Sequence, residues 1–120
     1  MTAASDNVSA LCRQLDEAVR LYGEQLTKKA ETDAEYRSAR AKRVLKARND
    51  GEKAISGAEL VADADDVIAR LRLEYLIAEG MAAATKSRLA MLTERIGFGR
   101  SLMASDRESD KQYSRDGANT

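Results

Sequence analysis

The stretch VADADDVIARLRLEYLIAEGMAAATKSRLAMLTERI, which runs from Val61 to Ile96, decides the fold of this chain. Within it, mostly apolar residues recur at alternating steps of three and four, the spacing that keeps one helix face against a partner helix. The members of this seam are Val61, Ala64, Ile68, Leu71, Tyr75, Ala78, Ala82, Thr85, Leu89, Leu92 and Ile96. We therefore expect a long helix that packs along one side on another long helix.

The sequence before this stretch predicts that partner helix. Ser5, Asp6 and Asn7 are good N-cap residues, and an apolar pattern follows them at helical spacing. The pattern begins with Val8, Leu11, Leu15, Ala18 and Tyr22, and continues more weakly through Leu26, Ala30, Ala34, Ala41, Val44 and Leu45. Asn49-Asp50-Gly51 is a turn signal, and none of the 120 residues is a proline.

The sequence thus predicts an all-α fold, a long antiparallel helical hairpin of the coiled-coil type over residues 1–104. Helix one covers about residues 6–49, the turn about 50–56, and helix two about 57–104, with Ser56 and Glu59 as a capping box. If the turn centres near residue 53, residue i lies opposite roughly residue 106 − i. Residues 105–120 are polar and mixed in charge, so we expect a flexible tail.

Helix two carries a second apolar line, which we call the outer stripe. Its members are Leu73, Leu76, Ile77, Ala84, Met91 and Phe98, on a face away from the seam. One partner helix cannot cover both lines, and contiguous exposed apolar surface usually marks an interface. We expect a homodimer that forms a four-helix bundle, or docking onto another protein. The alternative is a three-helix bundle, in which the start of helix one breaks off and covers the outer stripe.

The stretch YRSARAKRVLKAR, residues 36–48, has six cationic side chains and no acid, and we call it the basic strip. Its candidate contact residues are Tyr36, Arg37, Arg40, Lys42, Arg43, Lys46 and Arg48. The expected register places Glu59, Asp63, Asp65 and Asp66 beside it, so we favour a solvated face partly neutralised by the partner helix. Two alternatives are binding of single-stranded nucleic acid, with Tyr36 stacking on a base, and contact with an acidic protein.

Composition limits the chemistry of the chain. It has no histidine and one cysteine, so it lacks the residues for a Ser-His-Asp triad, a histidine-bound zinc or a di-iron bundle. We expect no enzyme, metal or cofactor. No apolar run is long enough to span a bilayer, the N-terminus does not resemble a signal peptide, and Cys12 suits a reducing compartment, so we expect a cytoplasmic protein.

Four features of the chain together resemble a known group of proteins. They are a tyrosine-bearing basic first helix, a Gly-containing turn, an alanine-rich second helix and the segment Arg100 to Ser105. The group comprises small helical accessory proteins encoded in the early regions of temperate bacteriophages, and the likeness covers residues 30–108. The resemblance implies a non-enzymatic phage protein that acts in the host cytoplasm. The chain departs from the secreted helical-hairpin family with a Trp-x-Gly turn, because it contains no tryptophan.

Three functions follow from these observations. The favoured one is an oligomeric adaptor that acts by protein–protein contact through the outer stripe or the basic turn end. The second is an accessory protein that binds single-stranded nucleic acid through the basic strip during phage replication or recombination. The third is an inhibitor of a host protein. The sequence does not identify the partner.

Overall fold

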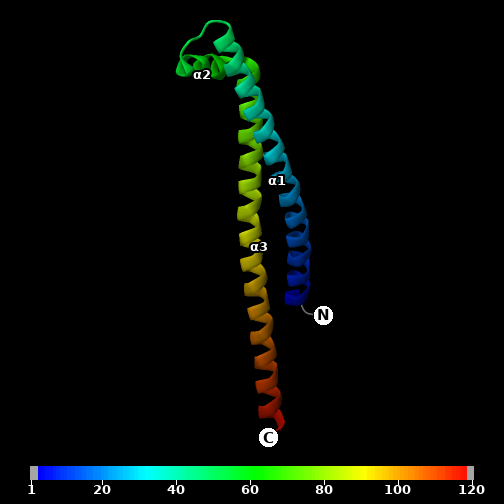
Figure 1. Cartoon of the computed structure of the whole chain (residues 1–120). Coiled ribbons are helices and arrows are strands. Elements are labelled where there is room, and N and C mark those ends of the chain that lie inside the picture. The colour runs from blue at the N-terminus through cyan, green and yellow to red at the C-terminus, as the bar shows by residue number, and fades with distance from the viewer. Residues whose placement is uncertain (1–2, 119–120) are drawn as a thin grey trace. The chain divides into compact units, whose positions relative to one another are not determined.

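The computed structural model describes residues 3–118 and the side chains of residues 3–113. Within this part the chain forms three helices and no strand, namely α1 (Ala3–Asn49), α2 (Ile55–Ala64) and α3 (Asp66–Ala118). Figure 1 shows α2 as the short helix at the turn between the two long ones. The fold is therefore an all-α helical hairpin, as the sequence predicts. Helix α1 is unbroken, so its first part does not form a separate third helix.

The chain divides into two compact units, and both long helices contribute to each. The described part of unit 1 consists of residues 3–21 of α1 and 85–118 of α3. Unit 2 consists of residues 22–84, which are the rest of α1, the turn, α2 and the start of α3. Each unit therefore has its own segment of the antiparallel pair, and we describe each by itself.

The end of α1 is a glycine C-cap. The Gly51 amide donates to the Arg48 carbonyl oxygen at 3.2 Å, and the Glu52 amide donates to that of Ala47 at 3.0 Å. This pair of bonds is the Schellman motif, which needs a left-handed residue between helix and loop. Gly51 supplies it with φ of 115°, a conformation that glycine adopts without a steric cost. The turn signal at residues 49–51 is confirmed.

The second predicted helix is interrupted at Asp65, where the prediction of one continuous helix is wrong. Asp65 has an extended backbone, with ψ of 129°. Its Oδ1 accepts hydrogen bonds from the amides of Val67 at 2.9 Å and Ile68 at 3.3 Å. An aspartate that caps the following turn in this way ends one helix and starts the next. The expected capping box at Ser56 is also wrong, because α2 begins at Ile55 after Ala54, which makes no side-chain cap.

The last helix is longer than the sequence suggested. Helix α3 continues to Ala118, beyond the expected end near residue 104. Gly97 and Gly99 lie inside it, and the polar residues after Ser105 contain no proline to stop it. Residues 104–113 are exposed along this extension. The mobility expected for residues 105–120 stays a prediction, and residues 119–120 lie outside the described part.

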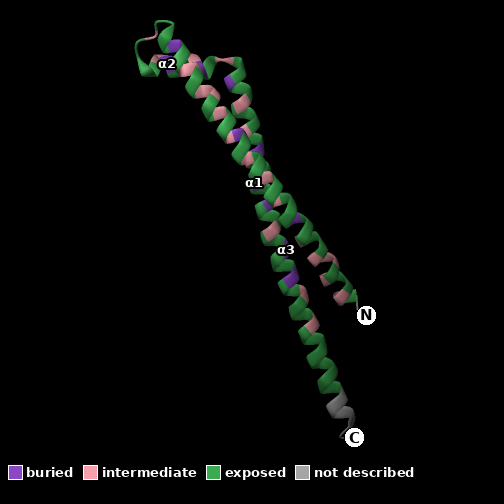
Figure 2. Cartoon of the chain, turned by 45° about the vertical axis from the view of Figure 1, so that its right-hand side comes forward, coloured by how far each residue is buried: buried purple, intermediate pink, exposed green. Residues whose placement is uncertain are grey.

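The seam of α3 is confirmed from Ile68 to Ile96. In unit 2, Ile68, Ala78 and Ala82 are buried, and Leu71 and Tyr75 are half-buried. In unit 1, Thr85, Leu92 and Ile96 are buried, and Leu89 is half-buried. Figure 2 shows buried positions recurring singly along the helices between exposed ones. Ala64 is exposed because it ends α2, so the seam does not continue through it; Ala62 is buried instead.

The seam of α1 is confirmed only as far as Tyr22. The predicted apolar continuation is wrong at five of its six positions, because Leu26, Ala30, Ala34, Ala41 and Leu45 are exposed. The sixth residue, Val44, is half-buried. The steps of three and four continue instead through residues that are mostly polar. The buried and half-buried members of this continuation are Gln25, Lys29, Thr32, Tyr36, Ala39, Arg43 and Ala47. The geometry of helix pairing therefore sets which positions face inward, whatever residues occupy them.

The inward polar residues of unit 2 are unevenly satisfied. Thr32 is 4% exposed, and its hydroxyl donates to the backbone carbonyl of Lys28 at 2.8 Å and is 3.1 Å from that of Lys29. Gln25 Oε1 and Arg43 Nη1 are buried and have no hydrogen-bond partner. A buried polar atom without a partner costs about 1–3 kcal/mol. Gln25 is thus a weak point in the seam of unit 2.

We expect Gln25→Leu to stabilise the protein. Leucine fits the seam spacing and removes the unpartnered oxygen, so the free energy of unfolding should rise by about 1–3 kcal/mol. The control is Gln14→Leu at an exposed position of α1, which should change stability by less than about 0.5 kcal/mol. Chemical denaturation followed by circular dichroism measures both, and equal effects of the two variants would contradict the role of the seam.

Candidate functional site

Three arginines of the basic strip are paired with acids of the same chain. Arg40 Nε donates to Asp63 Oδ1 at 2.9 Å, and Arg43 Nε donates to Asp65 Oδ2 at 3.1 Å. Arg37 pairs with Asp33 one turn earlier, also at 2.9 Å. The predicted meeting of acid and base across the hairpin is therefore confirmed. The partners are shifted from the simple register, because α2 and α3 are separate helices.

These pairs change the ionisation of their members in a consistent direction. The hydrogen bond from Arg40, opposed by desolvation, lowers the pKa of Asp63, and the same bond raises the pKa of Arg40. The pKa of Asp65 is lowered first by the backbone amide of Ile68 and then by Arg43. In α3 the Tyr75 hydroxyl donates to Glu79 Oε2 at 2.6 Å, which raises the pKa of Tyr75. The carboxylates at the turn end are thus held in their charged form.

The remaining cations of the basic strip are Lys42, Lys46 and Arg48. All three are exposed, and none makes an ion pair or hydrogen bond with its side chain among the described residues. Lys42 and Lys46 border a shallow groove of about 350 Å³ that also contains Val67 of α3. The strip is therefore half neutralised, and its free positive charge is concentrated at the end nearest the turn.

The structure brings Tyr36 to the outer stripe. Tyr36 is half-buried and lines a groove of about 210 Å³ together with Leu73 and Leu76. A second groove places its ring beside Arg40 and Arg72. The two predicted sites of unit 2 are thus neighbours. Because Tyr36 packs against α3, only part of its ring is accessible for stacking.

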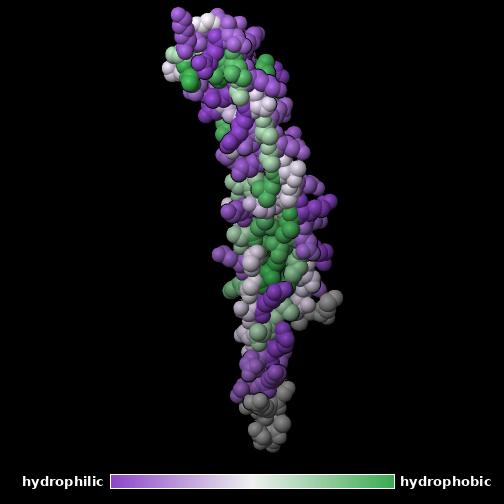
Figure 3. All heavy atoms as spheres, in the orientation of Figure 1, coloured by the Kyte–Doolittle hydropathy of each residue, from purple (hydrophilic) through white to green (hydrophobic). Residues whose placement is uncertain are grey.

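The outer stripe is exposed, as its spacing predicts. In unit 2 the exposed fractions are 55% for Leu73, 45% for Leu76 and 52% for Ile77. In unit 1 they are 41% for Met91 and 68% for Phe98. Ala84 is exposed as well. Figure 3 shows hydrophobic atoms reaching the surface between hydrophilic ones along the helices.

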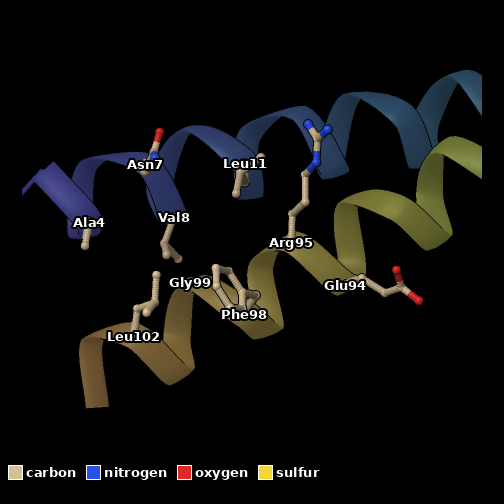
Figure 4. Close-up of a pocket in the computed structure, with 9 residues that line it drawn as sticks. All are labelled: Ala4, Asn7, Val8, Leu11, Glu94, Arg95, Phe98, Gly99 and Leu102. Atoms are coloured by element: carbon tan, nitrogen blue, oxygen red, sulfur yellow. The ribbon is translucent and has the colours of Figure 1, made fainter. Parts of the chain in front are cut away.

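Unit 1 contains an apolar groove between the two helix segments. Its volume is about 520 Å³, and Figure 4 shows Val8 and Leu11 of α1 pointing toward Phe98 and Leu102 of α3. The rest of its lining is Ala4, Asn7, Glu94, Arg95 and Gly99. The helices meet closely here, because a Cβ added at Gly99 would lie only 2.7 Å from Val8 Cγ2. The expected register placed Val8 opposite residue 98, one position from Gly99.

Sequence reasoning missed two features of these sites. Asp65 was expected only as one acid beside the basic strip, yet it also caps α3. The signal that could have found this role is the pair Asp65-Asp66 just before a regular apolar pattern, since aspartate is a favoured N-cap residue. The groove of unit 1 was not predicted, because its shape depends on how closely Val8 approaches Gly99, which the spacing of apolar residues does not indicate.

The described part of the chain contains no group of three or more potential metal-ligating side chains. None of its helices is both long and apolar enough to cross a membrane. Comparison with protein-family models, with curated proteins and with solved structures finds no match to this chain.

We expect Asp65→Asn to flatten the acid dependence of stability. Asparagine keeps an oxygen that accepts the capping bonds but loses the charge beside Arg43. Since the pKa of Asp65 is lowered from 3.8 in the folded chain, its charge stabilises the fold above that value, and this contribution disappears as the pH falls through the folded pKa. Melting temperatures between pH of about 5 and 2 should therefore fall more steeply for the wild-type chain.

The control for this pH series is Asp66→Asn. The Asp66 side chain is exposed and makes no hydrogen bond or ion pair among the described residues. Its replacement should leave the wild-type slope unchanged. Parallel slopes for wild-type protein and Asp65→Asn would contradict the role assigned to the Asp65 carboxylate.

Proposed function

We propose that this protein is a non-enzymatic interaction module that acts by protein–protein contact and self-associates through the outer stripe. The observation that carries the proposal is how the chain distributes its apolar side chains. Among the described residues, six of the nine buried hydrophobic residues are alanines, whereas fifteen large hydrophobic residues are exposed. A core of this kind leaves these large apolar side chains partly in water, and burial of apolar area drives association.

The residues around the outer stripe form a narrow apolar line bordered by charges. Three, four and seven residues from Ile77 in unit 2 lie Leu73, Gly80, Met81 and Ala84, together with the charged Arg70 and Glu74. The corresponding neighbours of Met91 in unit 1 are Ser87 and Phe98, together with the charged Arg88, Glu94 and Arg95. An apolar centre with a charged border is the usual composition of a protein contact surface.

The biological setting follows from the sequence resemblance alone. It implies a phage-encoded accessory or adaptor protein in the cytoplasm of a bacterial host. An inhibitor of a host protein would use the same kind of surface, with the host protein in place of a second copy.

We expect the purified chain to be a dimer and Ile77→Glu to weaken it. A charge in the middle of the outer stripe would be buried on association, so the dissociation constant should rise at least about tenfold. The control is Leu60→Glu on α2, because Leu60 is 71% exposed and lies outside the stripe. Light-scattering chromatography over a dilution series measures both. A wild-type monomer at every concentration would contradict self-association, and equal weakening by both variants would contradict the stripe.

A second candidate function is binding of single-stranded nucleic acid at the turn end. It is favoured by one observation, the exposed and unpaired Lys42, Lys46 and Arg48 in the described part of the chain. Cations that are already free of acids can neutralise phosphates without breaking an ion pair. The paired Arg40 and Arg43 are less suited to this role.

If this second function operates, a single-stranded oligonucleotide should bind with an affinity that falls as salt is raised. The logarithm of the affinity falls linearly with the logarithm of the salt concentration, and each phosphate contact contributes about 0.7 to the steepness of this fall. The double variant Lys42→Glu and Lys46→Glu loses two contacts, so the steepness should decrease by about 1.4. Fluorescence anisotropy measures the slope, with Lys86→Glu on α3 in unit 1 as the control. Binding that does not depend on salt, or no binding at low salt, would exclude this function.

A further inference from the structure

The groove of unit 1 and its most protruding side chain lie on the same surface. Phe98 lines the groove and is 68% exposed, and Leu102, one turn further along α3, is 45% exposed. Val8 and Leu11 form the opposite wall from α1 (Figure 4). The surface therefore carries both an apolar projection and an apolar hollow. A surface with both features can pack against a copy of itself.

The two helix segments approach each other closely beside the groove. Val8 fills the space that a side chain at position 99 would need, so the segments approach closely at Gly99. Phe98 directly precedes Gly99 in α3, so its side chain points about 100° around the helix axis from the position of Gly99. It therefore lies beside the contact with Val8. The aromatic ring is thus held at the edge of the groove, where α1 leaves most of it uncovered.

The groove also carries two opposite charges without partners. Glu94 and Arg95 both line it, and among the described residues neither side chain makes an ion pair or hydrogen bond. They are neighbours on α3, yet Figure 4 shows their side chains pointing in different directions. A surface with one acid and one base is complementary to itself under a two-fold rotation, which brings each acid to the base of the other copy.

We propose that this groove is the site where a second copy of the chain docks, in an isologous contact centred on Phe98. Phe98 of each copy enters the groove of the other, and Glu94 of each pairs with Arg95 of the partner subunit. Two aromatic rings that meet in this way gain an edge-to-face or offset contact in addition to their buried area. This inference rests on the self-association proposed above, and it adds the groove of unit 1 to the outer stripe as part of the same contact.

The charges at the groove select a second copy as its occupant. An unrelated apolar helix would cover the apolar walls but would offer no charge to Glu94 or Arg95. A second copy supplies both at once, because every residue contact in a two-fold interface occurs twice. The same symmetry makes the inference testable by exchange of charges.

The experiment compares Glu94→Arg, Arg95→Glu and the double variant that carries both changes. Each single variant places like charges at both pair positions, so the dimer dissociation constant should rise at least about tenfold at low salt. The double variant exchanges the two charges and should return to within about threefold of the wild-type value. The control is Arg88→Glu, at an exposed residue of the same segment that does not line the groove, and it should have little effect.

Mixing the two single variants gives the sharper test. The Glu94→Arg chain carries a base at both of positions 94 and 95, whereas the Arg95→Glu chain carries an acid at both. Each contact between these two chains joins a base to an acid, so both contacts are attractive in the mixed pair. Differently tagged chains should therefore form a mixed dimer more tightly than either variant pairs with itself. Circular dichroism of each variant checks that helix content is unchanged.

The outcomes separate this inference from the proposed function. A wild-type monomer at all concentrations would contradict self-association itself. If the wild type is a dimer and the single charge variants dimerise equally well, the groove contact is contradicted, and the outer stripe of unit 2 remains as the interface. Failure of the two single variants to pair when mixed would contradict the groove contact in the same way. Rescue by the double variant together with preferential mixed pairing would establish the groove contact.

Discussion

Two α-helices can bury only one strip of surface each, and this constraint explains most of the structure. The strip on α3 repeats at steps of three and four, and within the described part Leu92 is the one large side chain with less than 2% exposure. Most of the other buried apolar residues are alanines such as Ala18, Ala58 and Ala62, which allow helix backbones to approach closely. The interior is therefore small, and large apolar side chains remain on the outside.

A narrow interior also explains why ion pairs gather in unit 2. From Gln25 onward the inward positions of α1 are mostly polar, so apolar burial contributes little to the pairing of that segment. Arg40 and Arg43 instead contact Asp63 of α2 and Asp65 at the start of α3. Exposed pairs of this kind add little stability, but they favour the register in which they form, since a shift would separate Arg40 from Asp63 and Arg43 from Asp65. The acidic segment around Asp65 thus positions both α2 and α3 against α1.

The sequence predicted the parts of the fold where spacing and residue type agree. The seam of α3 from Ile68 to Ile96 has both the correct period and apolar residues, so its inward face could be identified. In α1 after Tyr22 the period continues but the apolar residues do not, and following apolarity led to exposed positions such as Leu26. The break at Asp65 depends on a local competition between a side chain and the backbone, which periodicity does not detect. The exposed outer stripe was predictable, whereas the groove of unit 1 depends on the contact between Val8 and Gly99.

The placement of large and small side chains is the opposite of that in a self-sufficient small domain. Such a domain places its leucines, isoleucines and phenylalanines inside, because each contributes about 1.5–3 kcal/mol when fully buried. Here Phe98 and Ile77 are more than half exposed, while alanines occupy much of the interior. A hairpin with this distribution gains most from burial when another surface covers its large side chains. The same small residues that let α1 and α3 approach closely therefore leave many large apolar side chains at the surface of the described part.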